Sequence, residues 1–184
     1  RKAHKRRNKV GFWSDGNLAY VTSLLFKKRF PETEVYIFGI DERKMKDFVF
    51  ADKTFDVTAI TDDLRVDHAF ECIGGPASGT GINQIIDYIN PEGTIAIMGV
   101  SEEPVPINTR MVLEKGLTIF GSSRSSAEDF RHVIDFYNDN PDVVSYLGNI
   151  INNTISVSTI KDMNRAFDDD IQKPGGKTVM IWEK

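Results

Sequence analysis

The sequence predicts an α/β fold built on a doubly wound, parallel, six-stranded sheet. Six short apolar runs alternate with segments of helical pattern, and five of these runs end in a turn that contains glycine. Strands separated by helices are joined by right-handed crossovers, which make the strands parallel members of one sheet. With 184 residues, the chain is long enough for one large domain, or for one domain with an appendage, around its own hydrophobic core.

The first turn lies within residues 10–20, between a hydrophobic lead-in and an apolar helical run. Gly11 and Gly16 have the outer spacing of the pattern G-x-G-x-x-G, and Trp13 stands where the middle glycine would be. In dinucleotide-binding folds, such a turn brings backbone N–H groups and a helix N-terminus close to a pyrophosphate. The same spacing is also typical of an ordinary strand-to-helix turn with Trp13 in the core, so both interpretations stay open.

The end of the second predicted strand, 35–38, indicates which dinucleotide would bind. In this fold an acidic residue at that position binds the ribose hydroxyls of NAD, but here the position is Gly39. Arg43 and Lys44 follow, and their charges suit the 2′-phosphate of NADP. The alternative is that Asp41 is the ribose carboxylate, displaced by two residues, and that the two cations belong only to a helix end.

The rest of the first 125 residues repeats the same alternation. Further strands are predicted at 54–58, 66–73, 94–98 and 117–120, and helices begin at Asn17 and span 83–89 and 108–115. A type I turn is expected at residues 90–93, and Gly116 ends the third helix. The glycine pair at 74–75 either lines a ligand at the carboxyl ends of the strands or is a simple turn.

The last sixty residues have a different pattern, without glycine turns after strands. The motif Ser125-x-x-Glu128 predicts a capped helix, a second helix is expected from about Thr159, and a terminal strand at 177–182. We therefore expect the end of a linker helix at 1–8, a dinucleotide-binding domain at 9–125, and a C-terminal segment at 126–184 that packs elsewhere in a longer protein. The absence of an initiator methionine supports the expectation of a longer protein.

Composition excludes several other classes of function. The net charge of −4 gives no overall attraction to nucleic acid, and the basic run at 1–9 is interpreted as a solvated helix end. No apolar run is long enough for membrane insertion. The single cysteine, Cys72, excludes an internal disulfide and a cysteine-cluster zinc site, and it favours a cytoplasmic location. His68 lies four residues before Cys72, and we interpret both as packing residues rather than metal ligands.

Several motifs together resemble the medium-chain, zinc-dependent alcohol dehydrogenases. They are G-x-W-x-D-G-N-L in the first turn, D-H-A-F-E-C-I-G-G, N-P-E-G-T-I-A-I-M-G-V-S, L-E-K-G-L-T-I-F-G-S-S-R, and G-K-T-V near the end. Within this family the sequence looks most like the ribulose-5-phosphate reductases of ribitol phosphate and teichoic acid synthesis. The resemblance covers almost the whole chain and implies a Rossmann-type sheet with a C-terminal extension of helices and strands.

The resemblance also implies which residues bind the cofactor. The pyrophosphate would lie against Gly11, Trp13, Asp15, Gly16, Asn17 and Leu18, and the 2′-phosphate against Gly39, Arg43 and Lys44. Ile73, Gly74, Gly99, Val100 and Ser101 would follow the adenosine and nicotinamide halves of the cofactor. Ser122, Ser123 and Arg124 would lie at its nicotinamide end.

The activity implied by the resemblance is reduction of D-ribulose 5-phosphate to D-ribitol 5-phosphate by NADPH. In the family, catalytic zinc is held by an N-terminal lobe that this sequence does not contain, so no residue here is assigned to zinc or to catalysis. The expected partners are the sugar phosphate, a second copy of the chain paired through the dinucleotide domain, and a cytidylyltransferase of the same pathway. The alternatives are a noncatalytic nucleotide-sensing module, another polyol or alcohol dehydrogenase, and an S-adenosylmethionine-binding methyltransferase, against which Gly39 argues.

Overall fold

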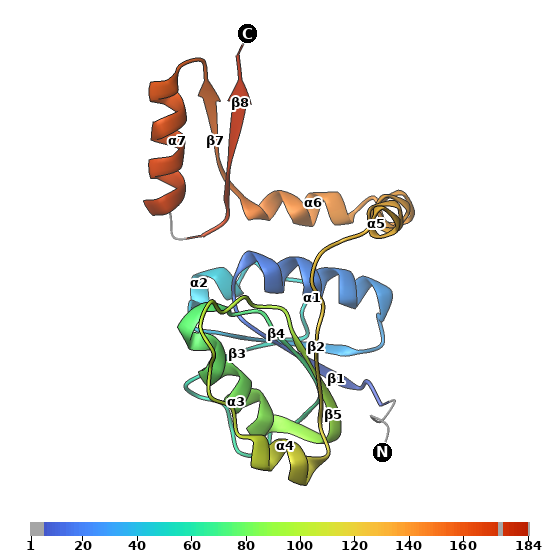
Figure 1. Cartoon of the computed structure of the whole chain (residues 1–184). Helices are drawn as coiled ribbons and strands as arrows, with labels where there is room; N and C mark the ends of the chain where they lie inside the picture. The colour runs from blue at the N-terminus through green and yellow to red at the C-terminus, as the bar shows by residue number, and fades with distance from the viewer. Residues whose placement is uncertain (1–5, 173–174, 184) are drawn as a thin grey trace. The chain divides into compact units, whose positions relative to one another are not determined.

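The computed structural model describes residues 6–172 and 175–183 and divides into two compact units, 1–124 and 125–184 (Figure 1). Residues 1–5, which form most of the predicted linker-helix end, lie outside the described part. Residues 6–8 lead into the first strand without helical structure.

The first unit is a parallel sheet of six strands in the order β3-β2-β1-β4-β5-β6. The chain therefore reverses its direction of strand addition between β1 and β4, and in such sheets ligands bind beside that switch point. The strands are β1 (Lys9–Trp13), β2 (Glu34–Gly39), β3 (Lys53–Asp56), β4 (Val66–Glu71), β5 (Ile89–Ile97) and β6 (Thr118–Gly121). The predicted six-stranded, doubly wound sheet is confirmed.

Helices cover both faces of this sheet. Figure 1 shows α1 (Asn17–Arg29) on one face and α3 (Ser78–Tyr88) and α4 (Thr109–Lys115) on the other. A short helix, α2 (Glu42–Met45), follows β2, and a 3-10 turn, η1 (Gly75–Ala77), precedes α3. As predicted, Gly116 ends α4 in a left-handed conformation with φ of 62°.

Successive side chains of β1 contribute to the hydrophobic core on opposite faces of the sheet. Phe12 stacks on Phe70 and meets the ring of Phe26 from α1 edge-on. Trp13, the next residue, points to the opposite face and stacks on Phe38. Successive side chains of a strand point to opposite faces, so β1 is buried on both sides, as a central strand of a parallel sheet requires.

The predicted type I turn at residues 90–93 is wrong. These residues lie inside β5, where the pairing with β4 shifts register between Val66 and His68. Glu92 has φ of 62°, which allows the chain to bulge while Ile89 pairs with Val66 and Thr94 with His68. Turn-forming residues thus shape a bulge within the strand instead of separating it from the helix.

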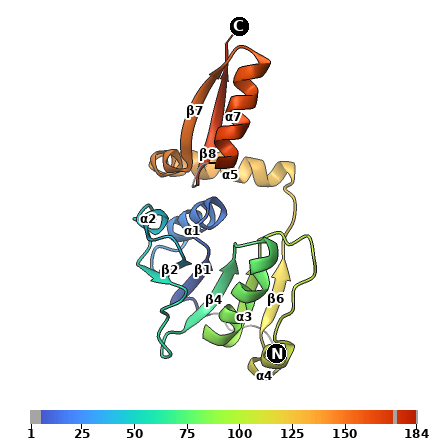
Figure 2. The ribbon, with the colours of Figure 1, turned by 90° about the vertical axis from the view of Figure 1, so that its left-hand side faces the viewer.

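The second unit pairs two parallel strands, β7 (Ile151–Val157) and β8 (Lys177–Trp182), with α7 (Ile160–Gln172) connecting them in the chain (Figure 2). Ile155, Val157 and Ala166 form its buried core. Before them in sequence come α5 (Ala127–Asp139), α6 (Val143–Leu147) and the 3-10 turn η2 (Gly148–Ile150). The sequence predicted α7 and β8 but not β7.

The capping box of α5 lies one residue later than predicted. Ser126, rather than Ser125, is the N-cap, and its Oγ accepts a hydrogen bond from the Asp129 N–H. The Asp129 carboxylate accepts in return from the Ser126 backbone N–H at 2.7 Å. Aspartate thus replaces the expected Glu128 as the third helical residue, because the shorter side chain also reaches back to the N-cap.

Candidate functional site

Gly11 and Trp13 belong to strand β1 and not to the turn that follows it. The Trp13 indole is fully buried, its ring lies 3.8 Å from that of Phe38, and its Nε1 donates to Gln84 Oε1 at 2.9 Å. A Cβ on Gly11 would lie only 2.4 Å from Trp13 Cζ3. Gly11 therefore leaves room for the indole, and the side chain of Trp13 faces the core rather than the surface.

The turn itself consists of Ser14, Asp15 and Gly16. Ser14 Oγ accepts from the Gly16 N–H at 3.0 Å, and Gly16 is the N-cap of α1. Gly16 has no side chain with which to cap the helix, and the first turn, which begins with Asn17 and Leu18, contains no acidic residue. The positive end of the helix dipole is therefore not neutralised by a carboxylate in the first turn, which suits the binding of an anion.

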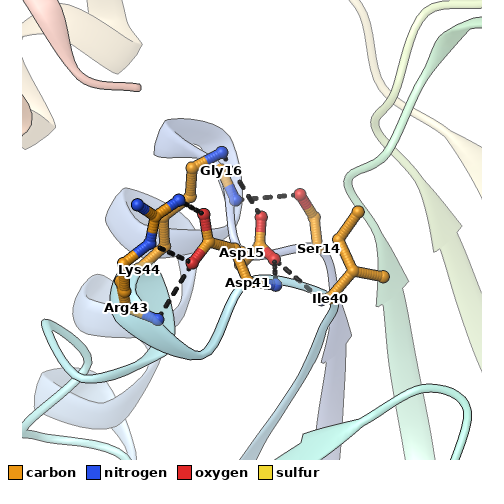
Figure 3. A network of polar contacts seen from close by, with 7 residues as sticks. All are labelled: Ser14, Asp15, Gly16, Ile40, Asp41, Arg43 and Lys44. Atoms are coloured by element: carbon orange, nitrogen blue, oxygen red, sulfur yellow. Dashed lines mark hydrogen bonds and ion pairs between the residues drawn. The ribbon is translucent and has the colours of Figure 1, made fainter. Parts of the chain in front are cut away.

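Asp15 links the turn after β1 to the turn after β2 (Figure 3). Its Oδ2 accepts hydrogen bonds from the backbone N–H groups of Ile40 and Asp41, both at 2.8 Å. Lys44 Nζ lies 4.0 Å from Asp15 Oδ1. The carboxylate predicted to lie along the pyrophosphate is thus directed at the end of β2.

Gly39 is buried at the end of β2, directly against Asp15. A Cβ at Gly39 would lie 2.8 Å from Asp15 Cβ, 2.9 Å from Asp15 Oδ2 and 3.0 Å from Met45 Sδ. Real Cβ atoms essentially never approach other atoms within 3.0 Å. The absence of a side chain at the end of β2 is therefore a packing requirement of this turn.

Asp41 and Arg43 form an ion pair beside Gly39. The Arg43 guanidinium donates to both Asp41 oxygens, at 3.2 Å from Nε and 3.0 Å from Nη2, and the Arg43 N–H donates at 2.9 Å. These hydrogen bonds from Arg43 lower the pKa of Asp41 to about 2. Asp41 is the N-cap of α2, and the Arg43 side chain is 81% exposed. Each cation at the end of β2 thus faces a carboxylate in this structure: Arg43 pairs with Asp41, and Lys44 lies near Asp15.

The turns after β4 and β5 lie in direct contact. Gly74 has φ of 70°, and a Cβ at Gly99 would lie 2.3 Å from the Gly74 nitrogen. The Gly75 N–H donates to the Val100 carbonyl at 2.7 Å, and Ser101 Oγ donates to the Gly75 carbonyl at 2.7 Å. Backbone-to-backbone packing requires glycine at positions 74 and 99, which also leaves these strand ends without side chains.

A buried carboxylate that the sequence reasoning missed joins these two turns. Glu71 is fully buried at the end of β4. Its Oε1 accepts from the N–H groups of Ile73 and Gly74 at 2.9 and 3.0 Å, and its Oε2 accepts from the Gly99 N–H at 3.2 Å. The available signal was a glutamate that ends a largely apolar strand just before a glycine pair.

The last residues predicted to bind the cofactor follow β6, the outermost strand of the sheet. Ser122, Ser123 and Arg124 are exposed, and Arg124 has φ of 70°. Because all six strands are parallel, these residues lie beyond the carboxyl ends of the strands, as the other turns do. Strands β5 and β4 lie between them and the turn after β1. The structure thus brings together the turns after β1 and β2, and separately those after β4 and β5.

Within residues 6–172 and 175–183, no group of three or more His, Cys, Asp or Glu side chains is placed to hold a metal ion. His68 Nδ1 accepts from the Thr94 N–H at 3.2 Å. Burial, with a smaller contribution from the Glu71 charge, raises the pKa of the Cys72 thiol to about 12. His68 therefore has a structural contact, and the Cys72 thiol has little tendency to ionise.

Comparison with known proteins identifies the family to which this sheet and its glycine turns belong. The sequence model of a family described as "Zinc-binding dehydrogenase" matches residues 43–139, slightly more than half of the chain. The chain belongs to the zinc-binding dehydrogenase family. The resemblance to zinc-dependent alcohol dehydrogenases is thereby confirmed.

Named relatives of this zinc-binding dehydrogenase chain are reductases of ribulose 5-phosphate. It is 47% identical over 182 residues to ribulose-5-phosphate reductase 1 of Staphylococcus aureus, covering 99% of this chain and 53% of that one. It is 46% identical over 183 residues to the ribulose-5-phosphate reductase of Bacillus spizizenii, covering 100% of this chain and 54% of that one. The chain thus spans about half the length of the curated relatives it matches.

A crystal structure of S. aureus TarJ in complex with NADPH is also similar to this dehydrogenase chain. The TM-score is 0.94 at 48% sequence identity, and the match covers 96% of this chain and 56% of that one. A match of this quality extends over both units of the chain.

Proposed function

We propose that this chain is the NADP(H)-binding part of an oxidoreductase that reduces D-ribulose 5-phosphate to D-ribitol 5-phosphate with NADPH. The observation that carries the proposal is the pair of cations, Arg43 and Lys44, beside a strand end that has glycine in place of a carboxylate. The names of the similar reductases support the substrate, and the NADPH complex of the similar TarJ structure supports the cofactor.

The described residues fit a dinucleotide in three places. The N-terminus of α1, with Gly16 as N-cap, would hold the pyrophosphate through backbone N–H groups and the helix dipole. Arg43 and Lys44 would bind the 2′-phosphate, with Arg43 exchanging its surface ion pair to Asp41 for the phosphate. The turns that contain Gly74 and Gly99 would let the sugar and nicotinamide lie against backbone.

For the whole protein we propose a catalytic zinc, since family resemblance implies one. Zinc would polarise the ketone of the substrate and stabilise the developing alkoxide. The described residues supply no cluster of ligands for it. We therefore expect this chain to bind NADPH without turning over ribulose 5-phosphate.

Calorimetric titration of the chain with NADPH and with NADH tests the proposal. We expect NADPH to bind at least tenfold more tightly, because a charge-assisted contact to a phosphate contributes about 1.5–3 kcal/mol and about 1.4 kcal/mol is a tenfold change. Arg43→Ala or Lys44→Ala should reduce NADPH affinity roughly tenfold and leave NADH affinity nearly unchanged.

Arg110→Ala is the matched control for these variants. Arg110 is an exposed cation on α4 that pairs with Glu114 at 2.8 Å, so its removal also deletes one surface ion pair. NADPH affinity should not change in this variant. Equal affinity for the two dinucleotides in the unmodified chain, or binding of neither, would contradict the proposal.

We also propose that two copies pair through β6. Among the described residues, this strand lies at the edge of the sheet and pairs with β5 alone, and its Phe120 is 47% exposed. An exposed edge offers unpaired backbone groups to a second strand. Light scattering should give the mass of a dimer, and Thr118→Pro should lower it; a monomer at micromolar concentration would contradict this proposal.

The location of the protein in the cell and its contact with a partner enzyme stay predictions. No helix of the described residues is long and apolar enough to cross a membrane. We propose a cytoplasmic location, on the basis of the single thiol, and contact with a cytidylyltransferase of the same pathway. Co-purification of a tagged whole protein with that enzyme is the test of the contact.

A further inference from the structure

We infer that Asp15 determines cofactor choice together with Gly39: its carboxylate fills the place that an NAD-selecting carboxylate would need at the end of β2. The preference for NADP is then fixed by two residues and cannot be reversed by changing Gly39 alone. This inference rests on the proposed function, since it concerns the same cofactor site. It adds a selecting residue located in a different turn from the cations that would bind the 2′-phosphate.

The first argument is steric. A Cβ at position 39 would lie 2.8 Å from Asp15 Cβ, an atom bound directly to the backbone, so rotation of the Asp15 carboxylate alone cannot relieve the contact. On another side, Met45 Sδ lies 3.0 Å from the same Cβ position. Any side chain at position 39 therefore requires Asp15 to move, and with it the turn after β1.

The second argument is electrostatic. Asp15 has only 10% of its side chain exposed, and its Oδ2 is held by the N–H groups of Ile40 and Asp41. An aspartate at position 39 would place a second carboxylate beside it, where solvent screens the repulsion poorly. Lys44 Nζ lies 4.0 Å from Asp15 Oδ1 and is a single positive charge against the two carboxylates. Two carboxylates therefore cannot share this place without loss of the Asp15 hydrogen bonds or uptake of a proton.

The consequence is a defined route to altered specificity. In NAD-binding members of this fold class, a carboxylate at the end of the second strand accepts hydrogen bonds from the ribose hydroxyls. Gly39→Asp alone would place this group against Asp15 and distort the turn that leads into α1. Asp15→Gly removes the Cβ that a side chain at position 39 would meet, together with the carboxylate and its charge, so the double change should allow the new carboxylate to face the ribose.

Four versions of the full chain test the inference: unmodified, Gly39→Asp, Asp15→Gly and the double variant. Thermal unfolding is measured without cofactor, and NADPH and NADH are then titrated separately. We expect Gly39→Asp to lower the melting temperature by roughly 5 °C, because overpacking costs about 1–3 kcal/mol and each kcal/mol shifts a domain of this size by about 2–4 °C. It should also weaken both dinucleotides at least tenfold.

The double variant should regain at least half of the lost melting temperature and should bind NADH more tightly than NADPH. Gly148→Asp is the control for adding an aspartate in place of a glycine, because a Cβ at Gly148 would meet nothing within 4 Å. The melting temperature of this control should stay within about 2 °C of the unmodified chain.

Two results are distinguishable and each overturns a different statement. If the unmodified chain binds neither dinucleotide, the proposed function fails and this inference fails with it. If the unmodified chain prefers NADPH but Gly39→Asp alone keeps the melting temperature and prefers NADH, the inference fails and the proposed function stands. A double variant that regains no stability over Gly39→Asp would also overturn the inference.

Discussion

Replacing Glu71 with glutamine tests how the buried carboxylate organises the edge of the sheet. The two side chains have nearly the same shape, but the amide has one acceptor oxygen and one donor nitrogen. Glu71 accepts from three backbone N–H groups in the turns after β4 and β5. In Glu71→Gln, the oxygen keeps the contacts to Ile73 and Gly74 only if the new –NH2 group faces the Gly99 N–H, donor against donor.

The expected loss follows from these contacts. A buried hydrogen bond replaced by two opposed donors costs about 1–3 kcal/mol, and each contact that changes from a charged to a neutral acceptor costs about 1 kcal/mol more. Two effects reduce the sum: a buried charge is removed, and the Gly99 N–H keeps its second acceptor, the Glu71 carbonyl, at 3.1 Å. The net expected loss in the free energy of unfolding is about 2 kcal/mol.

Equilibrium urea unfolding at neutral pH measures this loss, and titration with NADPH measures its effect on the glycine turns. We expect NADPH affinity to fall about threefold to tenfold, because Glu71 sets the relative position of two turns that would contact the cofactor. Glu114→Gln, at an exposed position on α4 whose side chain pairs with Arg110, is the control and should change stability by less than about 0.5 kcal/mol. If Glu71→Gln is as stable as the control variant, the role assigned to Glu71 is refuted.

Three further predictions concern packing around Gly11, the loss of stability at acidic pH through Asp67, and the reactivity of the Cys72 thiol. Gly11→Ala should destabilise the chain by about 2–3 kcal/mol in urea unfolding, because its Cβ would enter the Trp13 ring; an unchanged midpoint would show that the ring can move aside. Burial raises the pKa of Asp67, but hydrogen bonds from Asn90 and from two backbone N–H groups outweigh burial and lower it. Asp67 therefore stabilises the fold above about pH 4 and loses that contribution at lower pH. The difference in the free energy of unfolding between the unmodified chain and Asp67→Asn should become smaller from about pH 5 to about pH 3. A difference that stays constant over this range would contradict the prediction. Cys72, buried and with a raised pKa, should react with iodoacetamide at pH 8 much more slowly in the folded chain than in urea, and equal rates would contradict its burial.

The sequence predicted the six-stranded sheet well because its central strands are buried and read as continuous apolar runs. Residues 35–38 are an example, and the structure places β2 at Glu34–Gly39, where the residues from Val35 to Gly39 are buried. Strand β7 was missed because three polar residues, Asn152, Asn153 and Thr154, separate the exposed Ile151 from Ile155 and Val157 and interrupt the apolar pattern. The bulge at residues 90–93 was missed because turn residues have the same preferences within a strand as between elements.

The candidate site was predicted as a set of turns, but the direction of individual side chains was not. Spacing alone could not show that β1 extends to Trp13, which moves Gly11 into the strand and the indole into the core. Nor could it show that Asp15 turns toward the end of β2, because that direction depends on two N–H groups 25 and 26 residues away in sequence. The roles in cofactor binding of the residues in these turns stay predictions.

The burial of Trp13 gives the first unit an optical reporter of its unfolding. The chain has two tryptophans: Trp13 is fully buried in the first unit, and Trp182, on β8 of the second unit, is 65% exposed. Acrylamide should therefore quench the emission of Trp182 while Trp13 stays shielded until the first unit opens. Fluorescence quenching can thus follow the opening of the first unit without any added label, because Trp182 is already exposed in the folded chain.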